Sequence, residues 1–159
     1  MKNLKIIFLF SFSIILLLNS CKKDDDEYKY NFEDQELSGQ IAGESWTYET
    51  GGVFISDFNH PPLFDFRIFG TDTISPCSYN IASRSLLFFT PMEIGLYDIA
   101  DYLVTFYAEG EETENLITVL GAFEILTIDT ANKIITGRMD AKYDDDNFVN
   151  GNFSLTSCY

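Results

Sequence analysis

Apolar and polar side chains alternate along most of the chain after residue 37, and this two-residue period is typical of β-strands with one buried face. In LFDFRIFG, residues 63–70, the apolar Phe64, Phe66 and Ile68 alternate with Asp65 and Arg67. ESWTYET, YLVTFYAE and FEILTID repeat the pattern, and no run shows the 3.6-residue period of a helix. We therefore expect an all-β fold.

The last third of the chain predicts an antiparallel hairpin. IITGRMDAKY and FVNGNFSLTSCY flank the acidic turn DDDN. One face of the first run holds Ile135, Gly137, Met139 and Tyr143, and one face of the second holds Val149, Gly151, Phe153 and Leu155.

Turns rich in Gly and Asp divide the chain into about 8 to 10 expected strands. Such a set builds either an antiparallel β-sandwich or an up-and-down, lipocalin-like barrel, and the pattern leaves both open. Gly121, Gly137 and Gly151 lie inside expected strands, where glycine marks bends or bulges. These glycines favour strong curvature.

The first 20 residues are interpreted as a signal peptide. Lys2 and Lys5 precede an uncharged run, residues 6–18, that as a helix spans only about 20 Å, too short to cross a bilayer stably. Leu18-Asn19-Ser20-Cys21 resembles the bacterial lipobox, so Cys21 is expected to carry acyl chains that anchor the protein to a membrane. The alternative is an ordinary secretory signal.

The residues after Cys21 give an expected location. KKDDDE, residues 22–27, resembles the charged export tag of Bacteroidota surface lipoproteins, which implies an outer-membrane protein facing the outside. The alternatives are a periplasm-facing protein and a run that only keeps a tether solvated. We expect residues 21–36 to be a lipidated linker and residues 37–159 to be a single domain.

The charge of the chain argues against nucleic acid as a partner. Once Lys2 and Lys5 leave with the signal peptide, 8 basic residues remain against 25 acidic ones, a net charge of −17. Binding of nucleic-acid phosphates requires clustered Lys and Arg. The acidity favours solubility instead.

Two cysteines remain besides Cys21. An even number in an oxidising, exported compartment predicts a disulfide between Cys77 and Cys158. It closes a loop of about 80 residues, for which the chain-entropy model gives about 4–5 kcal/mol of stabilisation. Two separate buried thiols are the alternative.

Three segments, in their order along the chain, resemble a family of small Bacteroidota lipoproteins. They contain a G-x-x-W motif at Gly43–Trp46, a G-x-Y motif at Gly95–Tyr97 after a proline, and I-T-G-x followed by G-x-F in the closing hairpin. Met139 stands where the family usually has an aromatic residue. The resemblance implies an exported, tethered β-domain and brings no catalytic residues and no cofactor.

The sequence favours neither an enzyme nor a metal site. His60, the only histidine, lies in the proline-rich loop FNHPPL, and no G-x-S-x-G motif accompanies it. YDDDNFVNG fails the EF-hand spacing because Phe148 and Val149 occupy positions 5 and 6. A looser calcium site at Asp144 and Asp146 is the alternative to a charged turn that discourages edge pairing.

The 15 Phe and 9 Tyr are expected mainly in the core. Trp46 and Tyr48 are the candidates for stacking on sugar rings, although for Trp46 a core position is favoured over this role. We expect a non-catalytic module that binds a glycan, a small ligand or an envelope partner. The alternatives are a structural or accessory envelope lipoprotein without a ligand and, less favoured, a hydrolase.

Overall fold

The computed structural model describes residues 29–58, 61–71, 73–111, 115–118 and 120–159. Their eleven strands are β1 (Ser38–Ile41), β2 (Glu44–Thr47), β3 (Thr50–Ser56), β4 (Leu63–Phe69), β5 (Arg84–Pro91), β6 (Gly95–Asp98), β7 (Val104–Ala108), β8 (Asn115–Ile117), β9 (Leu120–Asp129), β10 (Ile134–Lys142) and β11 (Phe148–Ser157). The predicted all-β fold is confirmed. These described residues contain no helix long and apolar enough to cross a membrane.

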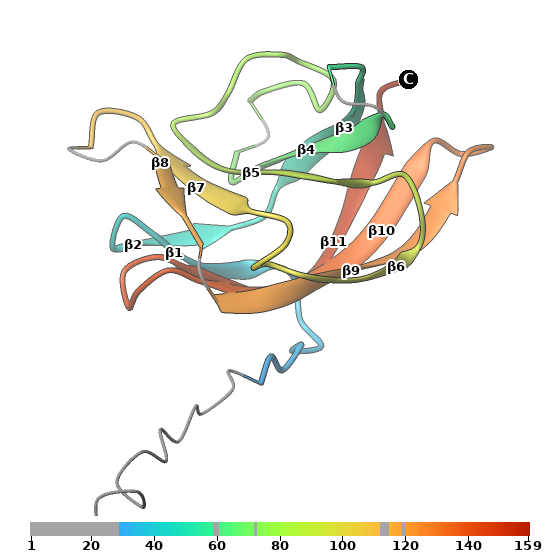
Figure 1. Ribbon diagram of the computed structural model, residues 1–159. Helices are drawn as coiled ribbons and strands as arrows, with labels where there is room; N and C mark the ends of the chain where they lie inside the picture. Colours follow the sequence, from blue (N-terminus) through green and yellow to red (C-terminus); the bar gives the residue numbers. More distant parts are fainter. Residues whose placement is uncertain (1–28, 59–60, 72, 112–114, 119) are drawn as a thin grey trace, which may run out of the picture.

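The strands form one mixed sheet that curls into a half-barrel (Figure 1). Its order is β6-β9-β10-β11-β3-β4-β5-β7-β8, and β1 pairs with β11 and β2 outside this path. Among the described strands every pair is antiparallel except β11 with β3, which pair in parallel at residues 156–157. This parallel contact was not expected from the sequence. It arises because β11 changes its partner from β1 to β3 along one edge.

The predicted inward faces of three strands are confirmed. In β4, Phe64, Phe66 and Ile68 are at most 1% exposed, whereas Asp65 and Arg67 remain partly accessible. The buried face of β10 and β11 holds Ile135, Gly137, Met139, Val149, Gly151, Phe153 and Leu155. Tyr143 departs from the prediction, because it follows the end of β10 and is 40% exposed.

Aromatic rings fill the interior of the half-barrel. The ring centroids of Phe66 and Phe88 lie 4.5 Å apart, those of Phe88 and Phe123 5.0 Å, and those of Phe123 and Tyr97 5.3 Å. These rings come from β4, β5, β9 and β6, so they connect opposite parts of the sheet. Full burial of one such ring stabilises the fold by about 2–3 kcal/mol.

The motifs behind the family resemblance supply core residues. Trp46, Tyr97 and Met139 are all less than 9% exposed. Gly137 lies where the register between β9 and β10 shifts, and a Cβ there would come within 2.4 Å of the Phe153 ring. The bend predicted at Gly137 is confirmed, and in this structure the motif residues serve packing.

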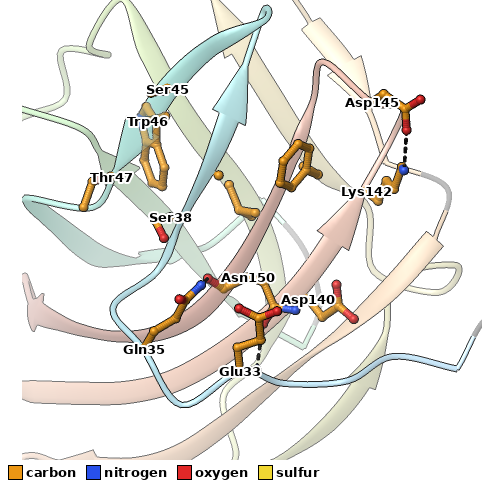
Figure 2. A pocket seen from close by; sticks show the side chains of 13 residues that line it. Glu33, Gln35, Ser38, Ser45, Trp46, Thr47, Asp140, Lys142, Asp145 and Asn150 are labelled. Carbon is orange, nitrogen blue, oxygen red and sulfur yellow. Dashed lines mark hydrogen bonds and ion pairs between the residues drawn. The ribbon is translucent and has the colours of Figure 1, made fainter.

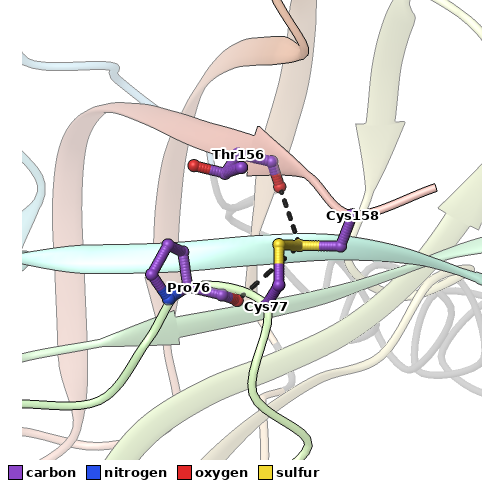
Figure 3. The surroundings of a disulfide bond; sticks show 4 residues. All are labelled: Pro76, Cys77, Thr156 and Cys158. Carbon is purple, nitrogen blue, oxygen red and sulfur yellow. Dashed lines mark hydrogen bonds between the residues drawn. A yellow bond between two sulfur atoms is a disulfide. The ribbon is translucent and has the colours of Figure 1, made fainter.

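The predicted disulfide is also present. Cys77 and Cys158 are bonded, with their Cα atoms 5.5 Å apart (Figure 3). The bond holds the loop between β4 and β5, residues 70–83, which we call the covering loop, to the chain just after β11. The loop comes so close to β3 that a Cβ on Gly52 would lie 2.1 Å from the carbonyl oxygen of Pro76.

Arg67 of β4 lies under the covering loop. Its Nη2 donates to Asp65 at 2.7 Å, and its Nη1 donates to the carbonyl oxygen of Tyr79 at 3.1 Å. The guanidinium carbon is 5.0 Å from the Phe54 ring centroid and 5.2 Å from that of Tyr79. The loop thus shields a charged group that is hydrogen-bonded to Asp65 and Tyr79 and contacts two neighbouring aromatic rings.

Residues 31–36, which we call the strap, lie along the outside of β10 and β11. The Asn152 N–H donates to the Gln35 carbonyl at 2.7 Å, and the Leu37 N–H donates to the Asn152 carbonyl at 2.8 Å. The guanidinium carbon of Arg138 lies 4.4 Å from the Phe32 ring centroid. The strap belongs to the segment expected to be a linker, of which Cys21 and residues 22–28 lie outside the described residues.

Candidate functional site

The outward faces of β2, β1, β11 and β10 form a polar surface beside the strap. Ser38 of β1 pairs with Thr47 of β2 and with Asn150 of β11, and Asn150 pairs with Asp140 of β10. Partners in register place their side chains on the same face of a sheet. The alternation that buries Val149 therefore turns Asn150 outward.

A groove of about 700 Å³ lies on this surface and is open to solvent (Figure 2). We call it the main groove. Glu33 and Gln35 of the strap line it on one side, and Ser45 and Thr47 of β2 line it on the other. Phe148 contributes a half-buried aromatic side chain.

Asn150 joins the strap to the floor of the main groove. Its Oδ1 accepts from the Glu33 N–H at 2.9 Å, and its Nδ2 donates to the Asn31 carbonyl at 2.9 Å. Gln35 Nε2 donates to the Asn150 carbonyl at 3.4 Å. One side chain thus positions the strap and lines the groove.

Charged groups occupy the β10 side of the main groove. Asp140 is 8% exposed and accepts from the Asn31 N–H at 2.8 Å. Lys142 Nζ lies 2.6 Å from Asp145 Oδ1. The hydrogen bond and positive charge of Lys142 hold the pKa of Asp145 below its ordinary value.

The structure does not place Trp46 as a stacking platform. Trp46 is 4% exposed and belongs to the core, and its Nε1 donates to the Arg84 carbonyl at 3.4 Å. Trp46 contributes to the lining of the main groove only with the small part of its side chain that is exposed. The favoured core position is therefore the one that the structure shows for Trp46.

Tyr48 lines a second groove, of about 550 Å³, on the other side of the strap. Its hydroxyl donates to the Ser154 carbonyl, which lies between the parts of β11 that pair with β1 and β3. Burial raises the pKa of Tyr48, the hydrogen bond to Ser154 lowers it, and the nearby Glu36 raises it further. Tyr48 and Trp46 therefore do not form one site. The Tyr48 hydroxyl instead provides a hydrogen-bond donor for a backbone carbonyl of β11.

The acidic turn after β10 satisfies its own polar groups. Asp144 Oδ1 accepts from the Asp146 N–H at 3.0 Å and from Asn147 Nδ2 at 2.9 Å. Among the residues that the structure describes, no group of three or more His, Cys, Asp and Glu side chains could hold a metal ion. His60 lies outside the described residues.

Sequence reasoning missed the main groove. Its lining residues Ser38, Ser45, Thr47 and Asn150 are outward members of alternating strands, and such residues look the same whether they face a ligand or water. The strap carried no signal either, because its contacts use mainly the backbone. The alternation of FVNGN places Asn150 on the face opposite Val149 and Gly151.

In comparisons with known proteins, the chain matches no family model, no curated protein and no solved structure. The hydroxyls, two amides, carboxylates, ammonium group and two aromatic side chains that line the main groove suit reversible recognition of a polar molecule.

Proposed function

We propose that this protein is a membrane-anchored, non-catalytic lipoprotein whose β-domain binds a glycan in the main groove. The observation that carries the proposal is the combination of Ser45, Thr47 and Gln35 around an open groove with the half-buried Phe148 ring. Sugars present many hydroxyls that pair with such groups, and the apolar face of a sugar ring packs on aromatic carbon. An open groove suits a chain-like ligand.

The charges around the groove favour an uncharged glycan. Its ionisable lining residues are Glu33, Asp140, Asp145 and Lys142, three acidic groups and one basic group. The whole chain carries a formal net charge of −15, which repels anions at a distance. We expect neutral oligosaccharides to bind and sugars rich in uronic acid or sulfate to be excluded.

Anchoring is the second part of the proposal. The lipobox-like segment ending at Cys21 and the charged run after it support attachment by acyl chains to the outer membrane, with the domain facing outward. Intact-mass analysis of the protein from its native membrane tests this part. A processed chain without fatty acid at Cys21 would contradict it.

The binding test uses the full chain in mild detergent and isothermal titration calorimetry with cellohexaose, chitohexaose, laminarihexaose and polygalacturonate. At least one neutral hexasaccharide should bind, and polygalacturonate should not. Phe148→Ala should weaken that binding by about two- to tenfold, the contribution of one aromatic contact. Phe58→Ala is the matched control, because Phe58 is 99% exposed and lies outside the groove.

Two results would count against glycan binding. Absence of binding to every neutral sugar would favour a structural or accessory envelope role without a ligand. Equal binding by wild type and Phe148→Ala would place the sugar elsewhere, and Tyr48→Ala would then test the second groove.

A further inference from the structure

Among the residues that the structure describes, the strap is held to β10 and β11 mainly by hydrogen bonds of its backbone. Asn31 and Glu33 donate to the side chains of Asp140 and Asn150, and Gln35 accepts from the Asn152 backbone. The side chains of the strap are exposed apart from Phe32, which is half-buried. Little apolar surface therefore holds the strap in place.

The strap begins to be anchored firmly at Leu37. This side chain is fully buried in the core, directly after the last strap residue. Detachment of residues 31–36 would therefore leave Leu37 as a fixed hinge. Polar contacts of this kind contribute about 1 kcal/mol each and exchange readily with water.

The strap forms the ridge between the two grooves. Glu33 and Gln35 line the main groove, whereas Asp34, Gln35 and Glu36 line the second groove. Asn150 contacts the strap and also lines the main groove. Detachment of the strap would remove one wall of the main groove. It would also break the hydrogen bonds that Oδ1 and Nδ2 of Asn150 make with the strap.

We propose that the strap is a reversible wall of the binding site, so that strap docking and glycan binding stabilise each other. This inference rests on the proposed function. A ligand that touches Glu33 and Gln35 binds the docked state better, and by linkage it shifts the strap towards that state. Because the strap leads to the segment that carries Cys21, a pull on the anchor would weaken ligand binding.

Asn152 offers a way to loosen the strap without altering the main groove. Its Nδ2 donates to Asp34 Oδ1 at 3.1 Å, and neither residue lines the main groove. Asn152→Asp replaces this hydrogen bond by two adjacent carboxylates. The double variant Asp34→Asn/Asn152→Asp carries the same groups in exchanged positions and should restore the contact.

Amide hydrogen exchange of Asn31 and Glu33 reports docking directly. In the full chain without ligand, Asn152→Asp should accelerate exchange at both amides by about three- to tenfold, and the double variant should restore the wild-type rates. Saturating amounts of the hexasaccharide that binds most tightly should slow exchange at both amides in the wild type. Asn152→Asp should also weaken the binding of this hexasaccharide. The factor should be smaller than the change in exchange rate, because the affinity falls only as the docked fraction of the protein falls.

A second matched pair of variants removes one aromatic ring from each outward arginine. Phe32→Ala loosens the strap at Arg138, and Tyr79→Ala removes a ring from Arg67 under the covering loop. Only Phe32→Ala should accelerate exchange at Asn31, by about two- to fivefold, and it should weaken sugar binding by a smaller factor.

The outcomes separate this inference from the proposed function. If the wild type binds none of the sugars, the proposed function fails and the coupling fails with it. If the wild type binds a sugar, and Asn152→Asp accelerates exchange but binds equally tightly, only the coupling is overturned. Slower exchange with sugar and recovery in the double variant would support it.

Discussion

The covering loop and the strap perform similar tasks on neighbouring parts of the sheet and differ in how they are held. Each places an aromatic ring on an outward arginine that also pairs with an acidic residue, Arg67 with Asp65 and Arg138 with Glu124. The covering loop is held by a disulfide, whereas the strap is held by hydrogen bonds and a single ring. The covalent bond holds the covering loop permanently, whereas the hydrogen bonds of the strap can be replaced by hydrogen bonds to water.

The exposure of the two arginines reflects this difference. The side chain of Arg67 is 18% exposed and that of Arg138 is 40% exposed. Arg67 meets two rings, and Arg138 meets one. The comparison indicates that the cover on β3 and β4 is held more tightly than the strap on β10 and β11, which is the part that must move in the proposed coupling.

Removal of the disulfide should have the largest effect. Cys77→Ser/Cys158→Ser opens a link across a sequence separation of 81 residues, and the chain-entropy model gives a loss of about 4–5 kcal/mol in the free energy of unfolding. Urea unfolding of the double variant and the wild type measures it. A loss below about 1 kcal/mol would mean that the covering loop holds without its covalent bond.

Gly52→Ala should come next. The added Cβ would meet the Pro76 carbonyl oxygen, and the disulfide prevents the loop from moving away, so we expect a loss of about 3 kcal/mol. Gly95→Ala is the control, because its Cβ would come no closer than 3.3 Å to another atom, the Tyr97 hydroxyl oxygen. Equal unfolding midpoints for the two variants would contradict the close approach of the loop.

The two arginines can be compared directly by Arg-to-Lys substitution. Arg67→Lys removes a planar group that contacts two rings and is hydrogen-bonded at several positions, and it should cost about 1–2 kcal/mol. Arg138→Lys should cost less than about 1 kcal/mol, because this pair is more exposed. Urea unfolding should rank them in this order, and the reverse order would contradict the comparison.

The smallest expected effect is a dependence on alkaline pH. Burial holds the pKa of Tyr48 above 10.0, so the folded state favours the protonated phenol. Its contribution is complete below pH 10 and is lost as the pH rises through the raised pKa, by less than about 1 kcal/mol. Between about pH 8 and about pH 11, wild type should lose more stability than Tyr48→Phe, and parallel losses would exclude this role.

Local sequence patterns predicted those parts of the fold in which the burial of side chains decides the conformation. The alternation of Phe64, Phe66 and Ile68 gave an inward face because only one register buries all three side chains. The even number of cysteines predicted the link between Cys77 and Cys158. Both signals come from residue types with few alternative environments.

The sequence carried no comparable signal for the covering loop, the strap or the main groove. The acidic composition of residues 31–36 is typical of a linker, and their docking depends on backbone groups that every residue carries. The position of Trp46 in the core depends on the curl of the whole sheet. The parallel contact between β11 and β3 depends on long-range topology, which local periodicity does not encode.

The partner set of β11 has a consequence for biosynthesis. β10, β1 and β3 all precede this strand in the chain, and each leaves an edge that only β11 fills. During synthesis, which proceeds from the amino end, these edges stay unsatisfied until β11 has been made. Assembly is therefore a late, nearly all-or-none event, and premature termination before β11 would give material prone to aggregation and degradation.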